Sequence, residues 1–453
     1  MTTLSRRGVV SGLGAAAALG PRRGHAAGTI QVWWTQGYYQ QEDQALKDLV
    51  ALFEKQSGMK VDLQIINGPD LITKMIAAIQ VGDVPDAVQS VTGGTFFQPR
   101  AVWNDQILEI ADVVATQESA FLPAALDACR FYNKATKKHG YYGVPIKCAT
   151  LMEEIWRPLV EEAGFSIDDL PKTQDAYFEF FEKVQDKLRS KGRRIFGLGY
   201  SMATKEADSN NLFHSFLVAY GGAGIVSPDG ALHVDDDKVR KAIVTSMERL
   251  TTPYRKGYVP PGAINWGDVD NNNAFYAKQI VMTPNATISI AVAQMEKKDQ
   301  YYRDIVTTGV PAGNDGKPVP SILGATSAFI PKAARNIDGA KAFLKWFIQP
   351  ANLNFYLKEA RGRWLPVMPA ALKDDPYWLD PSDPHRPVAA KYGLQLPTIA
   401  PWQTYTPAYA QVISEQLWAG GEANITQKNM TPEQAAEVAI KRVKEIWDQL
   451  PMG

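Results

Sequence analysis

The stretch WGDVDNNNAFYAKQIVMTPN combines a flat aromatic ring with side chains that donate and accept hydrogen bonds. Trp266 offers an apolar face to the C–H side of a sugar ring, and Asp268 and Asn271 carry polar atoms that can pair with adjacent hydroxyl groups. Asn285 stands at the end of the predicted strand that follows. The stretch therefore predicts binding of a hydroxyl-rich solute. Two alternatives stay open: core packing of Trp266, and capping of the next helix by Asp268.

The same stretch has aspartate and asparagine at alternating positions, as a calcium-binding loop does, but its spacing then fails. Asn273 stands where such a loop needs its sharp-turn glycine, and Gln279 stands where it needs a bidentate glutamate. The chain's two cysteines and five histidines are scattered and form no zinc-site pattern. We therefore expect no metal and no cofactor.

The sequence gives catalysis little support. Ser201 follows a predicted strand in the run Gly-Tyr-Ser-Met-Ala, but Ala203 replaces the second glycine of a nucleophile elbow. An exported carbohydrate hydrolase would need two carboxylates that flank a scissile bond. Asp268 with Glu153 or Glu154 is one conceivable pair, although no spacing rule brings them together. The sequence favours a binding protein that is not an enzyme.

Further candidate contacts lie in loops and on elements beside the predicted strands. The Thr-Gly-Gly turn at 92–94 can bring backbone N–H groups close to a ligand hydroxyl, although an ordinary turn fits equally well. Lys147 offers three donors, with a solvated lysine as the alternative, and His214 is either a contact or a packed histidine. The predicted ligand-binding residues are Gln36, Tyr38, Ser90, Thr92, Gly93, Lys147, His214, Trp266, Asp268, Asn271, Asn285, Thr326, Arg363, Trp364 and Trp402.

The elements that must position these residues alternate between strand and helix. Leu46, Leu49 and Phe53 recur at helical spacing in 44–58 and form one apolar stripe. Strands separated by helices of this length predict an α/β fold with a parallel sheet flanked by helices, in which ligands bind beyond the carboxyl ends of the strands. Predicted strands cover 29–34, 60–66, 86–91, 195–200, 279–283, 306–313 and 325–332. Predicted helices cover 44–58, 70–80, 173–188, 211–222, 238–250, 286–295, 340–349, 407–421 and 432–450.

Residues 1–27 have the charged region, the short apolar run and the small residues of a cleaved export signal. Their Ser-Arg-Arg arrangement fits a twin-arginine signal and predicts a periplasmic protein, with a basic tail as the alternative. Cleavage would remove four of the 48 basic residues, leaving 44 against 48 acidic residues and a charge of −4. This balance gives no support to a nucleic-acid partner. In an oxidising compartment, Cys129 and Cys148 either form a disulfide or remain two buried thiols.

Short segments along the chain resemble, in order, the landmarks of a known family. VGDVPDAVQSVTGG is similar to its turn-and-strand motif, and HGYYGVPIKCATLMEEIW is similar to its strand that crosses between lobes. FLVAYGGAG, NNNAFYAKQIVMTPN, LGATSAFIPKAARN and GRWLPVMPAAL resemble further motifs in the family's order. From about Thr29 to the C-terminus, the chain resembles the extracellular solute-binding proteins of ABC importers, in the carbohydrate-binding group related to maltose-binding protein.

The resemblance implies a two-lobed α/β protein of the periplasmic binding protein type (class II-like), with hinge crossovers and the ligand between the lobes. The lobes it implies comprise 28–147 plus 287–342, and 148–286 plus 343–453. It also implies a monomer that delivers carbohydrate, such as an oligosaccharide, polyol or sugar acid, to an ABC permease. A small anionic or nitrogenous solute and an exported carbohydrate hydrolase are the alternatives.

Arg363 and Trp364 stand where the family often has a Gly-Tyr pair facing the ligand. The arginine departs from that pattern and suggests an acidic group on the ligand, because guanidinium binds such anions bidentately. A structural ion pair across the hinge is the competing interpretation.

Overall fold

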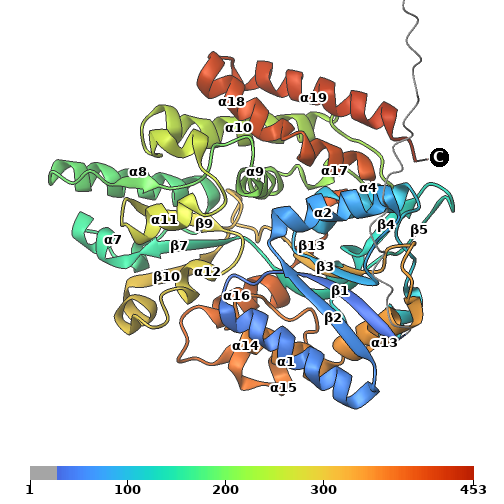
Figure 1. Cartoon of the computed structure of the whole chain (residues 1–453). Coiled ribbons are helices and arrows are strands. Elements are labelled where there is room, and N and C mark those ends of the chain that lie inside the picture. The colour runs from blue at the N-terminus through green and yellow to red at the C-terminus, as the bar shows by residue number, and fades with distance from the viewer. Residues whose placement is uncertain (1–27, 453) are drawn as a thin grey trace, which may run out of the picture.

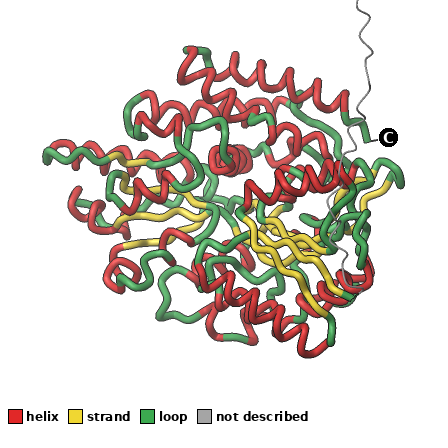
Figure 2. Tube along the Cα trace, viewed as in Figure 1, coloured by secondary structure: helices red, strands yellow, loops and turns green. Residues whose placement is uncertain are grey.

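The computed structural model describes residues 28–452, so the predicted export signal at 1–27 lies outside the described residues. The described chain forms two lobes, each a sheet flanked by helices, and this confirms the predicted fold class (Figure 1). The strands gather in two groups, with loops crossing from one group to the other (Figure 2).

The first lobe is built on a sheet with the strand order β2-β1-β3-β12-β6. Helices connect β1, β2 and β3, which run parallel, whereas β12 is antiparallel to both β3 and β6. The sheet is therefore mixed, and not wholly parallel as predicted. Its strands are β1 (Thr29–Thr35), β2 (Lys60–Ile66), β3 (Ala87–Ser90), β6 (Val144–Ala149) and β12 (Gly324–Phe329). Helices around this lobe include α1 (Gln40–Ser57), α2 (Gly68–Val81), α3 (Gly93–Phe96), α4 (Gln98–Trp103), α5 (Ala111–Val114), α6 (Pro123–Asp127), α13 (Ile337–Phe347), α14 (Pro350–Glu359), α15 (Ala371–Asp374) and α16 (Arg386–Ala390).

Helix α1 shows how the sequence pattern produces this lobe. Leu46, Leu49 and Phe53 are each at most 2 % exposed and pack into the core beneath the sheet. Burying one such side chain stabilises the fold by about 1.5–3 kcal/mol. The helix ends at Gly58, whose φ of 73° lies in the left-handed region that glycine adopts without a steric penalty.

The second lobe is built on a sheet with the strand order β10-β7-β9-β8, in which β7 is antiparallel to both of its neighbours. The predicted helix 407–421 is divided in two at Gln416, whose φ is 53°. The strands are β7 (Met152–Trp156), β8 (Phe196–Leu198), β9 (Ile280–Asn285) and β10 (Ile305–Gly309). The helices are α7 (Arg157–Ala163), α8 (Gln174–Ser190), α9 (Ala207–Ala219), α10 (Asp237–Arg255), α11 (Asp270–Tyr276), α17 (Pro407–Ser414), α18 (Leu417–Lys428) and α19 (Pro432–Gln449).

Shorter elements fill the space around the two sheets. The predicted helix 286–295 is reduced to α12 (Ser289–Val292). The strands β4 (Arg130–Asn133) and β5 (Lys138–Tyr141) form an antiparallel pair, and β11 (Ser321–Ile322) and β13 (Thr398–Ile399) form a parallel pair.

The packing differs from the lobe boundaries expected from sequence. Phe343, Phe347 and Trp364 lie in one core with Trp34 of β1, although the expected boundary places 343–453 in the other lobe. Conversely, β10 falls within 287–342 but pairs with β7 in the second sheet.

Cys129 and Cys148 are both buried and unbonded, as in the alternative of two thiols. The Cys148 thiol points at the carbonyl oxygens of Leu365 (3.7 Å) and Pro366 (3.6 Å), and burial raises its pKa above the ordinary value.

Candidate functional site

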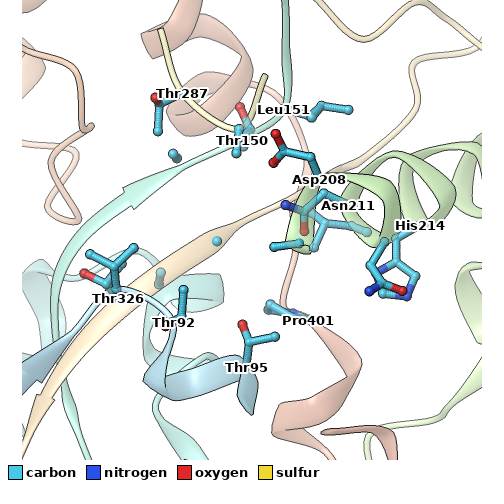
Figure 3. A pocket seen from close by; sticks show the side chains of 18 of the residues that line it. Thr92, Thr95, Thr150, Leu151, Asp208, Asn211, His214, Thr287, Thr326 and Pro401 are labelled. Atoms are coloured by element: carbon cyan, nitrogen blue, oxygen red, sulfur yellow. The ribbon is translucent and has the colours of Figure 1, made fainter. Parts of the chain in front are cut away.

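A cavity of about 370 Å³ opens between the two lobes, a volume within the range of small-molecule sites. Its walls come from the turn after β3, the connections after β6 and β9, the first half of α9, and loops near residues 320–326 and 401–404. Thr92, Thr95 and Thr326 lie on one side of the open space, and Asp208 and Asn211 lie on the other (Figure 3). A solute in this space would touch both lobes.

The turn after β3 forms part of the first wall. Thr92 lines the cavity, and its carbonyl oxygen accepts two backbone N–H groups of α3. Gly93 approaches Ser90 so closely that an added Cβ would stand 2.8 Å from the Ser90 Cβ, so a larger residue would displace the turn. Ser90 and Gly93 thus shape the turn without lining the cavity. Thr326 of β12 lines it beside Thr92 and accepts a hydrogen bond from Gln89 (3.2 Å).

The floor of the cavity lies where the chain crosses between the lobes. Thr150 and Leu151 are the two residues between β6 and β7, and both line the cavity. Asn285 ends β9 beside them and also lines the cavity. Its amide donates to the Thr287 carbonyl oxygen (2.6 Å) and to Ser289 Oγ (3.0 Å), so that the donor group stabilises the turn.

Helix α9 presents its first turns to the cavity from the second lobe. Glu206 caps this helix, and its carboxylate accepts the backbone N–H groups of Asp208 (2.5 Å) and Ser209 (3.0 Å). The Asp208 and Asn211 side chains point into the open space (Figure 3). Burial, with Glu206 and Asp268 as further causes, raises the pKa of Asp208 well above its ordinary value.

His214 and Trp402 close one end of the cavity. Both line it, but both also have partners inside the protein. His214 Nε2 lies 3.0 Å from Tyr409 Oη, and burial lowers the pKa of His214 to about 3, so the ring is neutral at pH 7. Trp402 is 2 % exposed, and its indole N–H donates to the Ala223 carbonyl oxygen (2.9 Å). These two residues form an apolar, uncharged wall.

Only some residues of the stretch 266–285 line the cavity. Asp268 is exposed and lines the cavity; the capping alternative does not hold, because α11 begins at Asp270 and Asp268 makes no cap hydrogen bond. Asn271 is buried, and its amide donates to the Pro284 carbonyl oxygen (3.2 Å), which joins α11 to β9 outside the cavity lining. Trp266 packs on the core of the second lobe, as its alternative states.

Lys147 and Arg363 belong to one cluster around Glu42. The Lys147 ammonium lies 2.5 Å from Glu42, and both side chains are 1 % exposed, so Lys147 does not line the cavity. Arg363 lines the cavity, with Nη1 3.3 Å from the other Glu42 oxygen. Both cations lie over the ring of Trp364, which also lines the cavity, with Nζ at 4.8 Å and Cζ at 4.7 Å. Against the effect of burial, the two cations hold the pKa of Glu42 below its ordinary value.

The ion pair of Arg363 stays within one lobe. Glu42 lies on α1, which packs against α14, and Arg363 follows α14. The pair therefore does not cross the hinge. Tyr38, at 42 % exposed, lines the cavity rim next to Arg363. Gln36 is exposed and lines a separate shallow hollow.

Glu153 and Glu154, considered above for a hydrolase, lie in β7 at 1 % and 0 % exposed and do not line the cavity. Glu154 Oε2 lies 2.8 Å from Thr307 Oγ1, which lies 2.6 Å from His385 Nδ1. His385 Nε2 lies 2.7 Å from the carbonyl oxygen of Tyr301. Burial raises the pKa of Glu154 to about 8 and lowers that of His385 to about 4. Glu154 therefore belongs to a buried structural network, and Glu153 is buried beside it in β7.

Asp208, Asn211, Thr95, Thr150 and Thr287 line the cavity but were not predicted. The first two were missed because the predicted helix begins at 211, whereas α9 begins at 207. Acidic residues are frequent in the first turn of a helix, and this signal could have moved the predicted start upstream. Thr95 lies in the short helix α3, Thr150 and Thr287 lie in the connections after β6 and β9, and none of the three carries a motif of its own.

Residues 48–387, more than half of the chain, match the family model of the bacterial extracellular solute-binding proteins. The chain belongs to this family, which confirms the predicted resemblance. A comparison with curated protein sequences finds no match.

Solved structures of several solute-binding proteins share the fold. An ABC transporter solute-binding protein from Thermotoga lettingae TMO bound with α-D-tagatose has 20% identity and a TM-score of 0.73, covering 94% of this chain and 100% of its own. Maltose-bound MalE3 of T. maritima has 17% identity and a TM-score of 0.72, covering 92% and 100%. UgpB from Mycobacterium tuberculosis in complex with glycerophosphocholine has 18% identity and a TM-score of 0.71, covering 94% and 99%.

None of the helices within residues 28–452 combines the length and the apolar composition needed to cross a bilayer. Those residues also contain no group of three or more histidine, cysteine, aspartate or glutamate side chains placed to hold a metal ion.

Proposed function

We propose that this chain is the periplasmic substrate-binding component of an ABC importer, which takes carbohydrate between its lobes and delivers it to the permease. The observation that carries the proposal is a cavity lined from both lobes by hydroxyl, amide and carboxylate groups beside the rings of Trp364 and Trp402. Sugars match such a lining, since their edges are polar and their faces apolar. Proteins of the same fold are described as bound with tagatose, maltose and laminaribiose.

The cluster around Glu42 bears on the class of carbohydrate. An acidic ligand at Arg363 would have to compete with Glu42, a buried carboxylate that already accepts hydrogen bonds from Arg363 and Lys147. We therefore favour an oligosaccharide or polyol over a sugar acid.

The proposed mechanism is closure of the lobes around the solute. Binding favours the closed form only to the extent that the solute makes better contacts there than in the open form. Because Thr92 and Asp208 come from different lobes, a sugar that bonds both would supply this difference. We further propose that the chain acts as a monomer and that residues 1–27 direct its export.

We also propose that the chain performs no catalysis. Asp208 and Asp268 are the carboxylates that line the cavity in the described chain, and both come from the second lobe. A glycosidase needs its two carboxylates on opposite sides of the scissile bond. Sustained release of product from candidate glycosides would contradict this proposal.

Thermal-shift screening against sugars, polyols and sugar acids tests the function directly. A ligand at about 100 times its Kd should add about 2.7 kcal/mol to the free energy of unfolding. Thr92→Val should reduce this gain, while Thr73→Val, on the exposed face of α2, should leave it unchanged. Stabilisation by another solute class, with none by any carbohydrate, would refute the proposal.

A further inference from the structure

The charges on the two walls of the cavity differ. Arg363 is the cation among the cavity-lining residues of the described chain, and it shares the Glu42 carboxylate with the buried Lys147. On the facing wall, Asp208 and Asp268 both line the cavity. Neither has a lysine, arginine or histidine nitrogen of residues 28–452 within 4.0 Å. The second lobe therefore presents two carboxyl groups without a counter-ion to the solute.

The helix end does not supply the missing positive charge. The first N–H groups of α9 carry a partial positive charge, but Glu206 already accepts two of them. Asp208 retains a side-chain hydrogen bond from Asn211. Its carboxylate otherwise faces open space, half-buried and close enough to Glu206 and Asp268 for both to disfavour its ionisation.

Two buried amides add acceptors on the same wall. Asn210 and Asn272 both line the cavity, at 2 % and 3 % exposed, and the Oδ1 atom of each lacks a hydrogen-bond partner in the described chain. Carboxylate and amide oxygens only accept hydrogen bonds. The oxygens of these amides and of the two carboxyl groups, all on the cavity-lining side chains of the second lobe, therefore favour a ligand group that is rich in donors.

We propose that the cavity selects a solute with a protonated amine, an amino sugar in particular, and that the ammonium group binds between Asp208 and Asp268. This inference rests on the proposed carbohydrate-binding function and narrows it. A neutral sugar could donate hydroxyl groups to the same oxygens, but closure would then bury both carboxyl groups without a counter-ion. An ammonium group supplies both the donors and the opposite charge.

Isothermal titration of the signal-free chain with D-glucose, D-glucosamine, N-acetyl-D-glucosamine and D-glucuronate, and with the matching galactose series, tests this. We expect the amine of at least one series to bind about tenfold or more tightly than its neutral partners, since hydrogen bonds between charged groups are the stronger ones. The uronates should bind most weakly.

Variants tie the preference to the two carboxylates. Asp208→Asn and Asp268→Asn should each lower the affinity for the amine about tenfold, with little change for the neutral sugar. Asn is isosteric with the protonated carboxyl, so the melting temperature without ligand shows whether each variant is folded. Asp62→Asn, an exposed carboxylate of β2, is the matched control and should change neither affinity.

The outcomes separate the two proposals. Equal binding of amine and neutral sugars, or tighter binding of uronates, would overturn the amine preference and leave the carbohydrate function standing. Equal losses for both ligands in Asp208→Asn would overturn it as well. Binding of no member of either series would also overturn the amine preference, and the thermal-shift screen against oligosaccharides and polyols would then decide the carbohydrate function separately.

Discussion

Replacing Glu154 by glutamine should change how the stability of the protein depends on pH. The prediction follows from the hydrogen positions in the buried chain of Glu154, Thr307 and His385. The carbonyl oxygen of Tyr301 can only accept, so His385 Nε2 must carry a hydrogen. If Thr307 donated to Glu154, His385 Nδ1 would also need a hydrogen and the ring would be charged. Burial, which lowers the pKa of His385 to about 4, opposes that charge.

The consistent arrangement is a neutral one. A protonated Glu154 donates to Thr307, Thr307 donates to His385 Nδ1, and His385 Nε2–H donates to Tyr301. The pKa of Glu154, raised by burial to about 8, agrees with this assignment at pH 7. A glutamine amide can donate to Thr307 in the same way, so the variant should keep the chain of hydrogen bonds.

The magnitude follows from linkage between protonation and folding. The pKa of Glu154 is about 8 in the folded state against an ordinary value of 4.5. Because the folded value is the higher one, the stability from Glu154 is fully present below 4.5 and is lost as pH rises towards 8. One proton corresponds to about 1.4 kcal/mol per pH unit, or about 5 kcal/mol over the whole interval. Glu154→Gln removes this loss of stability with rising pH, because the glutamine amide does not ionise.

Urea unfolding between pH 5 and 8 measures the effect. The stability of the variant relative to the natural chain should rise by about 1.4 kcal/mol per pH unit across this range. Glu359→Gln, an exposed carboxylate on α14, is the matched control and should give a curve parallel to that of the natural chain. Parallel curves for Glu154→Gln would mean that Glu154 is ionised in the folded state and that the deduced hydrogen positions are wrong.

Three further predictions concern the cluster around Glu42 and the cavity wall. Lys147→Met should destabilise the fold by about 3–5 kcal/mol in urea unfolding, because Glu42 stays buried with a longer ion pair to Arg363. Lys441→Met, at an exposed position of α19, should lower the free energy of unfolding only slightly. A loss equal to that of Lys147→Met would contradict the argument. Arg363→Ala should weaken neutral and acidic sugars alike by titration calorimetry, whereas selective loss of acidic sugars would show that the guanidinium contacts ligand anions. His214→Gln should leave the pH profile of binding unchanged between pH 5 and 8, because the pKa of about 3 keeps the ring neutral throughout; loss of a titration step would refute this.

The elements that the sequence predicted well are those whose residues carry a local pattern. The strand predicted at 60–66 matches β2, and the helix predicted at 432–450 matches α19 to within a residue. At α19, the side chains of Thr431 and Gln434 each bond the other's backbone, so the start of the helix is encoded within four residues. The break at Gln416 has no glycine or proline to announce it, and its positive φ depends on the surrounding packing.

Contacts between distant residues could not be predicted in the same way. Lys147 and Glu42 are 105 residues apart, and Arg363 and Glu42 are 321 apart. A lysine between apolar residues indicates that some partner is needed, but nothing local names Glu42 as that partner. The polar neighbours of Trp266 in the sequence suggested a ligand contact, although its ring packs on the core of the second lobe.

In the proposed closure, the short link of Thr150 and Leu151 would couple the position of the lobes directly to the bound solute. Rotation of one sheet relative to the other must change torsion angles in this link, and the same two residues touch whatever fills the space above them. A solute bound there would contact a surface whose shape changes with the angle between the lobes. The residues that contact the solute would then also be the residues whose torsion angles change on closure. No structural change would need to pass through the hydrophobic core of either lobe.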